Sequence, residues 1–195
     1  MAGTTRVSSG YSILTRDQTM IHKASSRCLV ASAGFQADRV ALHKLLRVRC
    51  SGYKQDHGRE ISCPAVAQML SNTLYNRRFF PLYTFNLCAG LDKEGKGAVY
   101  TYDAIGSHER VGFSCQGSGK DLMQPVLDNQ LQSASPLLWP PVSTATKLSK
   151  EECLDLVKGA FAAATERDIY TGDAVQIFIM TRDGLTEETL PLRKD

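Results

Sequence analysis

Residues 77–110 read RRFFPLYTFNLCAGLDKEGKGAVYTYDAIGSHER, and this stretch decides the fold. Two runs rich in apolar, β-branched and aromatic residues, 83–91 and 98–102, flank the polar segment 92–97. Gly95 and Gly97 can adopt the positive φ angles that a tight reversal requires. The stretch therefore predicts a β-hairpin. No folding rule requires the flanking sequences Arg-Arg-Phe-Phe-Pro and Tyr-Asp-Ala-Ile-Gly-Ser, so these point to a particular family.

Length and composition suit one domain with a full-sized core, since the chain has 195 residues, of which 43% are hydrophobic and 22% charged. The formal charge of +3 is too small for a nucleic-acid-binding arm, and we expect no nucleic acid. No apolar run is long enough to span a bilayer, and residues 1–10 lack a hydrophobic signal core. We therefore expect no membrane partner and a location in the cytoplasm and nucleus.

The cysteines and histidines suggest no metal centre. The six cysteines are scattered, mostly within apolar runs, and none has C-x-x-C spacing, which favours buried thiols. The four histidines are also scattered and lack the spacing of metal ligands. We expect neither a metal nor a cofactor.

Upstream of the hairpin, hydrophobic patterns predict strands at 5–14 and 19–24, joined by a turn at 15–18, and a buried strand at 28–33. Periodicity predicts a helix over 38–52, with Gly52 as its stop. A second helix is expected to begin near Ser62 and to end at Pro81.

Downstream of the hairpin, we expect a strand at 110–116 and then a helix that begins near Ser118 and is bent by Pro125. Residues 133–147 are rich in Ser, Thr and Pro and predict a surface loop. Ser149 and Glu152 form a capping box at the start of another helix. Two strands, 174–181 and 185–190, close the chain.

This order of strands, helix pair, strands, helix pair and strands predicts an α+β fold with four layers, an α-β-β-α sandwich. Each helix pair needs a sheet face on which to bury its apolar side, and the two sheets then cover each other. No linker or internal repeat is visible, so residues 1–195 form one predicted domain.

Several motifs make a resemblance specific: Ala33-Gly34-Phe35, residues 77–81, residues 90–102, Leu-Asp-Asn-Gln at 127–130, Glu-Arg-Asp-Ile-Tyr-Thr-Gly-Asp at 166–173, and the final Leu-Arg-Lys-Asp. The chain resembles the beta subunits of the 20S proteasome core particle, and within that family most closely the beta-6 branch. The resemblance covers nearly the whole chain. It implies a sandwich of the N-terminal nucleophile hydrolase type.

Active members of that family use a freed N-terminal threonine as the nucleophile and its own amine as the base, tuned by a lysine and an aspartate. The resemblance places Thr4 at the position of the aspartate and Met20 at that of the lysine. Lys23 lies three residues further along and is expected on the opposite face of the strand. The sequence therefore predicts a non-catalytic subunit.

An outer shell of the family's site persists at Ser118, Asp168 and Thr171, for which a helix cap and a loop brace are the simpler interpretations. The resemblance also implies that the family's first hairpin is absent from this sequence, and we expect the native subunit to have a further N-terminal segment. An alternative is an active N-terminal threonine endopeptidase whose nucleophile lies upstream of Met1. A free-standing α/β scaffold is a third hypothesis.

The resemblance implies a structural role in a seven-membered beta ring that is stacked on an opposing beta ring and capped by alpha rings. Such a subunit helps to assemble the chamber for ATP- and ubiquitin-dependent protein degradation. Contact candidates are residues 92–96, 133–147 and 190–195. Asp103 is expected beside the substrate pocket of a neighbouring active subunit, so peptide substrates would be met only through that neighbour.

Overall fold

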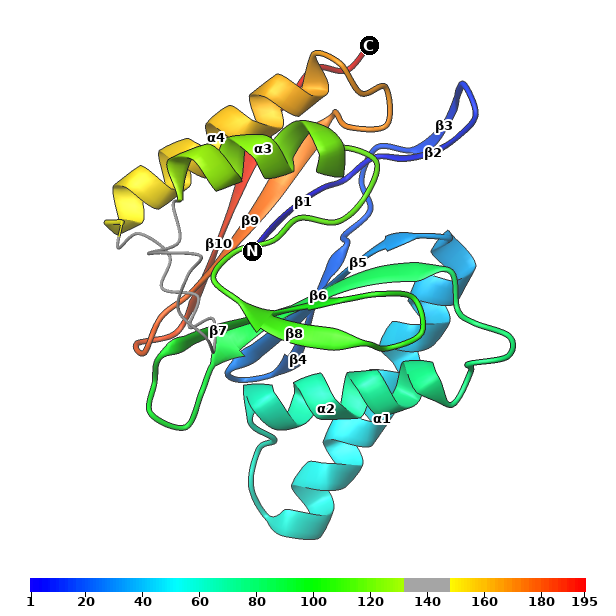
Figure 1. The fold of residues 1–195 in the computed structure, drawn as a ribbon, viewed down its shortest axis with the longest axis vertical. Coiled ribbons are helices and arrows are strands. Elements are labelled where there is room, and N and C mark those ends of the chain that lie inside the picture. Colours follow the sequence, from blue (N-terminus) through cyan, green and yellow to red (C-terminus); the bar gives the residue numbers. More distant parts are fainter. Residues whose placement is uncertain (132–147) are drawn as a thin grey trace, which may run out of the picture.

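The computed structural model describes residues 1–131 and 148–195, and its elements form four layers (Figure 1). The predicted loop 133–147 lies outside the described residues. None of the described helices is long and apolar enough to cross a membrane.

The central layers are two antiparallel sheets. The larger has the order β4 (Ile21–Ser25), β5 (Cys28–Gly34), β6 (Thr84–Leu91), β7 (Gly97–Tyr102) and β8 (His108–Val111). The smaller has the order β1 (Ala2–Thr4), β9 (Ala174–Met180) and β10 (Leu185–Pro191).

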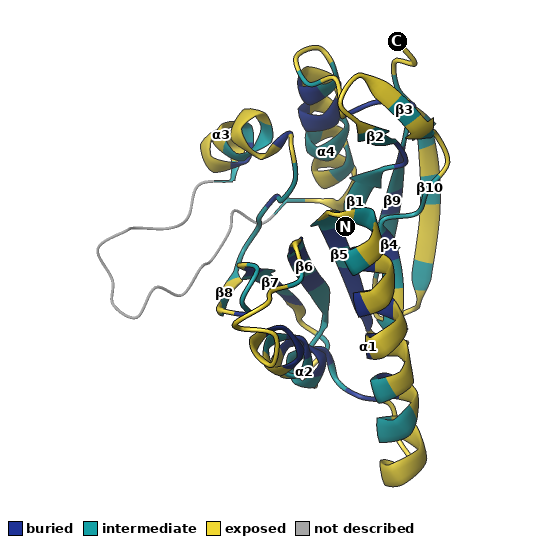
Figure 2. Ribbon diagram, turned by 90° about the vertical axis from the view of Figure 1, so that its right-hand side faces the viewer, coloured by how far each residue is buried: buried dark blue, intermediate teal, exposed yellow. Residues whose placement is uncertain are grey.

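Helices cover the outer face of each sheet. The larger sheet is covered by α1 (Gln36–His57) and α2 (Cys63–Tyr75), and the smaller one by α3 (Lys120–Gln130) and α4 (Lys150–Thr165) (Figure 1). Figure 2 shows buried stretches on β5 and β6, which are neighbours in the larger sheet, and on α2, which packs against that sheet. The predicted α-β-β-α sandwich is confirmed.

The predicted hairpin forms as β6 and β7, with Leu91 opposite Gly97 and Leu87 opposite Thr101. One carboxylate oxygen of Asp92 accepts the backbone N–H groups of Glu94 and Lys96, which closes the turn. The hairpin tip also contacts the β9–β10 turn, because the Arg182 guanidinium donates to the carbonyl oxygens of Glu94 and Gly95. The two sheets are thereby joined at that end.

Several predicted boundaries are wrong. The predicted strand 5–14 is a small hairpin, β2 (Val7–Ser9) and β3 (Ser12–Thr15), because Gly10 adopts φ 58° and reverses the chain. Helix α1 continues through Gly52 and ends at Gly58, which has a left-handed φ of 63°. A glycine inside a helix costs only about 1 kcal/mol, and burial of Leu46 and Cys50 on α1 offsets it.

Two other elements are shorter than predicted. Helix α2 ends at Tyr75, before Pro81, and residues 76–80 form a turn. Strand β8 ends at Val111, because beyond it the side chains of Ser114 and Gln116, and not the backbone, bond to Thr101 on β7.

The layer of α3 and α4 largely follows the sequence. The capping box forms: Ser149 Oγ accepts the N–H of Glu152 at 3.2 Å, and Glu152 Oε2 accepts the N–H of Ser149 at 2.8 Å. Pro125 lies inside α3. Phe161 of α4 packs against Val175 and Ile177 of β9, which fixes this layer on the smaller sheet.

Candidate functional site

Three residues of the predicted outer shell meet at the end of α4. Ser118 Oγ donates a hydrogen bond to Asp168 Oδ2 at 2.6 Å, and Thr171 Oγ1 donates to the same oxygen at 2.7 Å. The backbone N–H of Tyr170 donates to Asp168 Oδ1 at 3.1 Å. Asp168 thus ties the segment before α3 to the loop after α4.

This geometry corrects the interpretation of Ser118 as a helix cap. The N-cap of α3 is Gly119, and no side chain caps that helix. The hydroxyl of Ser118 instead bonds a residue 50 positions away. The alternative interpretation, a loop brace, agrees with the structure.

The shell contains hydroxyls and a carboxylate but no imidazole. His22 and His43 contact each other edge to face, His57 stacks on Tyr53, and His108 stacks on a tyrosine of β7. None of these contacts involves Ser118, Asp168 or Thr171. A hydroxyl nucleophile needs a base positioned to take its proton, and Asp168 already accepts bonds that hold two loops together.

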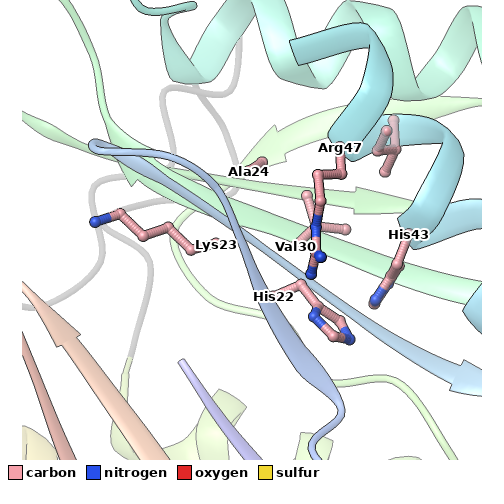
Figure 3. A pocket seen from close by; sticks show the side chains of 7 residues that line it. His22, Lys23, Ala24, Val30, His43 and Arg47 are labelled. Atoms are coloured by element: carbon pink, nitrogen blue, oxygen red, sulfur yellow. The ribbon is translucent and has the colours of Figure 1, made fainter. Parts of the chain in front are cut away.

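Thr4 and Met20 lie where β1 passes the start of β4. Thr4 is opposite Val175 in the sheet, and a Cβ placed on Gly3 would lie 3.6 Å from Met20 Cβ. Met20 therefore lies beside Gly3, the chain neighbour of Thr4, and neither Thr4 nor Met20 holds an ionisable side chain. Lys23 is exposed and points away from His22, His43 and Arg47 (Figure 3), so it projects from the other face of β4.

The β1 end of this neighbourhood joins the loop that carries Asp168. The N–H of Thr5 donates to the carbonyl of Ala174 at 3.0 Å, and Arg6 Nη1 donates to the carbonyl of Ile169 at 2.9 Å. Thr4 and the shell are consequently parts of one region of the molecule, although they are far apart in sequence.

A buried ion pair beside this region was not predicted from the sequence. Arg6 Nε lies 2.6 Å from Asp173 Oδ2, with side chains 2% and 4% exposed, and Arg16 Nη1 lies 2.5 Å from Asp173 Oδ1. Burial alone would raise the pKa of Asp173, but the hydrogen bonds from Arg6 and Arg16 outweigh it and lower that pKa below its ordinary value. Nothing local in the sequence pairs residues 6 and 173.

The same arginines hold the C-terminal tail. Arg6 donates to the carbonyl oxygens of Arg193 and Asp195, at 3.3 and 3.1 Å, and Arg16 donates to that of Lys194 at 2.7 Å. The backbone of this contact candidate is therefore anchored to the body of the protein, while the side chains of residues 193–195 stay exposed.

Asp103 occupies the turn between β7 and β8. Its Oδ1 accepts the N–H groups of Ile105 and Ser107 at 3.1 and 2.8 Å, and its own N–H donates to the carbonyl of Ser107. The turn is fixed on α2 because Ser71 Oγ donates to the carbonyl of Gly106 at 2.6 Å. Asp103 is exposed, and no described residue donates to its Oδ2. One carboxylate oxygen is thus free to meet another molecule.

The motif Arg77-Arg78-Phe79-Phe80 forms the turn after α2 and faces solvent. Phe79 and Phe80 are 98% and 82% exposed, and the Arg78 guanidinium lies 5.9 Å from the centre of the Phe79 ring. Two adjacent aromatic side chains held in the open are unusual for an isolated domain and suit a contact surface.

The four-layer sandwich and the Ser118–Asp168–Thr171 shell define a protein of the N-terminal nucleophile hydrolase type. A family model described as proteasome subunit matches residues 1–180. The chain belongs to the proteasome subunit family. It is 57% identical to proteasome subunit beta type-1 of Arabidopsis thaliana and 45% identical to that of Drosophila melanogaster, in each case over all of this chain and over 87% and 82% of the relative. Beta type-1 is the branch also called beta-6, which the sequence motifs indicate.

Proposed function

We propose that this chain is a non-catalytic, structural subunit of the beta ring of the proteasome core particle. The observation that carries the proposal is the residue types at Thr4 and Met20, the two positions at which the resemblance places the carboxylate and the ammonium group of the family's mechanism. Threonine and methionine cannot supply that ion pair at any pH. Without it, nothing at these two positions lowers the pKa of a terminal amine or orients it as a base.

The shell supports the same conclusion. The hydroxyl groups of Ser118 and Thr171 both donate hydrogen bonds to Asp168, so the shell holds two loops together. The alternative, an active threonine endopeptidase, would need substitutes for the carboxylate and the lysine, which Thr4 and Met20 do not supply. No observation on the described residues favours that alternative.

Assembly is then the function. The proposed partners are the neighbouring beta subunits, the opposing beta ring and the alpha ring, and the proposed location is the cytoplasm and nucleus. The exposed side chains of Phe79 and Phe80 offer apolar area to a neighbour, and the hairpin tip at residues 92–96 offers charges on a turn that Asp92 keeps rigid. A closed ring needs a different surface on each flank of a subunit, and these segments supply two.

Two measurements on native particles test the proposal. A tagged copy of the chain should co-purify at particle size with alpha and beta subunits, whereas a monomer in fresh extract would contradict ring membership. An electrophilic probe directed at catalytic threonines should label other subunits and leave this one unlabelled. Covalent labelling of this chain at saturating probe would overturn the non-catalytic assignment.

We further propose that Asp103 adjusts substrate choice in a neighbouring active subunit. Its free Oδ2 on an exposed, rigid turn would attract basic or hydrogen-bond-donating groups of a bound peptide. Asp103→Asn keeps the oxygen that closes the turn and removes the charge, whereas Asp103→Ala loses both. Particles with Asp103→Asn should cleave peptides with basic residues more slowly relative to neutral ones, and unchanged selectivity would remove the basis of the proposal.

A further inference from the structure

Three cysteines from separate elements meet in the core beneath α2. Cys28 lies on β5, Cys88 on β6, and Cys63 is the first residue of α2. Each is 0% exposed, and their three Sγ atoms all lie within 4.8 Å of one another, with 3.4 Å between those of Cys28 and Cys88. We call these residues the thiol cluster.

The backbone explains the meeting. In the sheet, Cys28 is opposite Gly90, so Cys88 is its diagonal neighbour on the same face, which α2 covers. A side chain at Gly90 is impossible, because its Cβ would lie 2.0 Å from the carbonyl oxygen of Arg27. Because position 90 has no side chain, Cys63 at the start of α2 can lie against β5 and β6, with its sulfur beside those of Cys28 and Cys88.

The surroundings of Cys63 favour the thiolate form of its side chain. Hydrogen bonds from Cys28 and Cys88 lower the pKa of Cys63, and the charge of Arg110 acts in the same direction. The N-terminal end of a helix also stabilises a thiolate. The hydrogen bond to Cys63 and burial raise the pKa of Cys28. The three sulfurs therefore lie side by side in a place closed to water.

We propose that the thiol cluster binds one Cu(I) ion. Thiolate sulfur is a soft ligand that selects Cu(I), Zn(II) or iron–sulfur clusters. Structural zinc requires four ligands, and the group that the described residues form here has three cysteines and no histidine or carboxylate. A site of three sulfurs in an apolar core suits Cu(I), which accepts two or three sulfur ligands.

Loading is an exchange of protons for one cation. Cu(I) takes the place of the S–H proton at each sulfur that binds it as a thiolate, and each displaced proton leaves to solvent. Any remaining sulfur stays a neutral thiol ligand. No atom is oxidised or reduced.

The test uses the full chain, refolded without oxygen in the presence of Cu(I) and a competing chelator. We expect one copper per chain, and X-ray absorption at the copper edge should show a shell of sulfur neighbours only. Cys63→Ala should reduce bound copper to background. Cys50→Ala is the matched control, because Cys50 is buried in the same core outside the thiol cluster and should leave bound copper unchanged.

Other results would overturn the proposal. These are folded wild-type chain without copper, equal copper in Cys63→Ala and wild type, or retention of Zn(II) in preference to Cu(I). A Cys28–Cys88 disulfide in chain alkylated at the moment of cell lysis would show a redox pair instead. If Cys63→Ala does not fold, the absorption spectrum of the wild-type protein decides alone, since oxygen or nitrogen neighbours would exclude the cluster.

Discussion

Asp173→Asn should destabilise the protein strongly by isolating a buried arginine. Asparagine tolerates the positive φ of 66° at this position, so the change removes the charge and leaves the backbone unstrained. Breaking a buried ion pair by removing one partner costs about 3–5 kcal/mol. Arg6 keeps hydrogen bonds to the carbonyl oxygens of Ile169, Arg193 and Asp195, so the lower end, about 3 kcal/mol, is expected. The half-exposed Arg16 adds little.

Urea and thermal unfolding of the full chain measure this loss. For a chain of this size, about 3 kcal/mol corresponds to a fall in Tm of roughly 6–12 °C. The control is Glu166→Gln, which breaks the pair with Arg193 whose side chains are 59% and 50% exposed, and which should cost no more than about 1 kcal/mol. If Asp173→Asn were no less stable than Glu166→Gln, the buried pair would have no special role.

The pH dependence provides a second check on Asp173. The pKa of Asp173 is lowered in the folded protein. The contribution of Asp173 to the free energy of unfolding is therefore complete above its unfolded-state pKa of about 3.9, and it is lost as the pH falls through the folded-state pKa. The stability gap between wild type and Asp173→Asn should therefore narrow in acid. A gap that widened below pH of about 4 would contradict the sign of the shift.

Three further predictions concern single positions. Gly106→Ala should lower the free energy of unfolding in urea by about 3 kcal/mol, because φ is 94° and the new Cβ would lie 2.5 Å from a backbone oxygen of α2. Gly10→Ala is the control: its φ is also positive but the space around it is open, so the loss should be only about 1 kcal/mol. Ser149→Ala should cost about 1 kcal/mol through loss of the capping box at α4, and an unchanged urea midpoint would mean that packing alone holds that helix. Burial, followed by nearby charges, lowers the pKa of His43 in the folded protein to about 3. The contribution of His43 to the free energy of unfolding should therefore be complete above its unfolded-state pKa of about 6.5, and should fall by about 1.4 kcal/mol per pH unit as the pH drops from there toward about 3. His43→Gln should remove this slope.

The parts of the fold that follow from sequence are those set by local chemistry. The β6–β7 hairpin follows from the glycines between two β-rich runs, and the start of α4 follows from Ser149 and Glu152, because each of these signals acts within a few residues. The errors arise where tertiary contacts override a local signal. Gly52 does not stop α1, because burial of one face of the helix outweighs the small cost of a glycine.

In the candidate site, too, residues within recognisable motifs could be predicted, whereas contacts between residues far apart in the sequence could not. The resemblance indicated Thr4, Met20 and the three shell residues, and the structure joins the three shell residues by hydrogen bonds. The Arg6–Asp173 pair could not be predicted, because its partners are 167 residues apart and no local pattern joins them. The role of Ser118 was mistaken for the same reason, since its partner Asp168 is 50 residues away.

The pairing of β1 with β9 and the anchoring of the tail by Arg6 set an order of events during synthesis. Ala2 is opposite Ile177, so β1 cannot pair with β9 until the residues around 177 have been translated. At roughly 5–20 residues per second, the stretch from Ala2 to Ile177 takes about 9–35 s to make. The larger sheet, whose strands end at Val111, can form within that time. The three strands of the smaller sheet are thus brought together after those of the larger sheet, because two of them lie within residues 174–191.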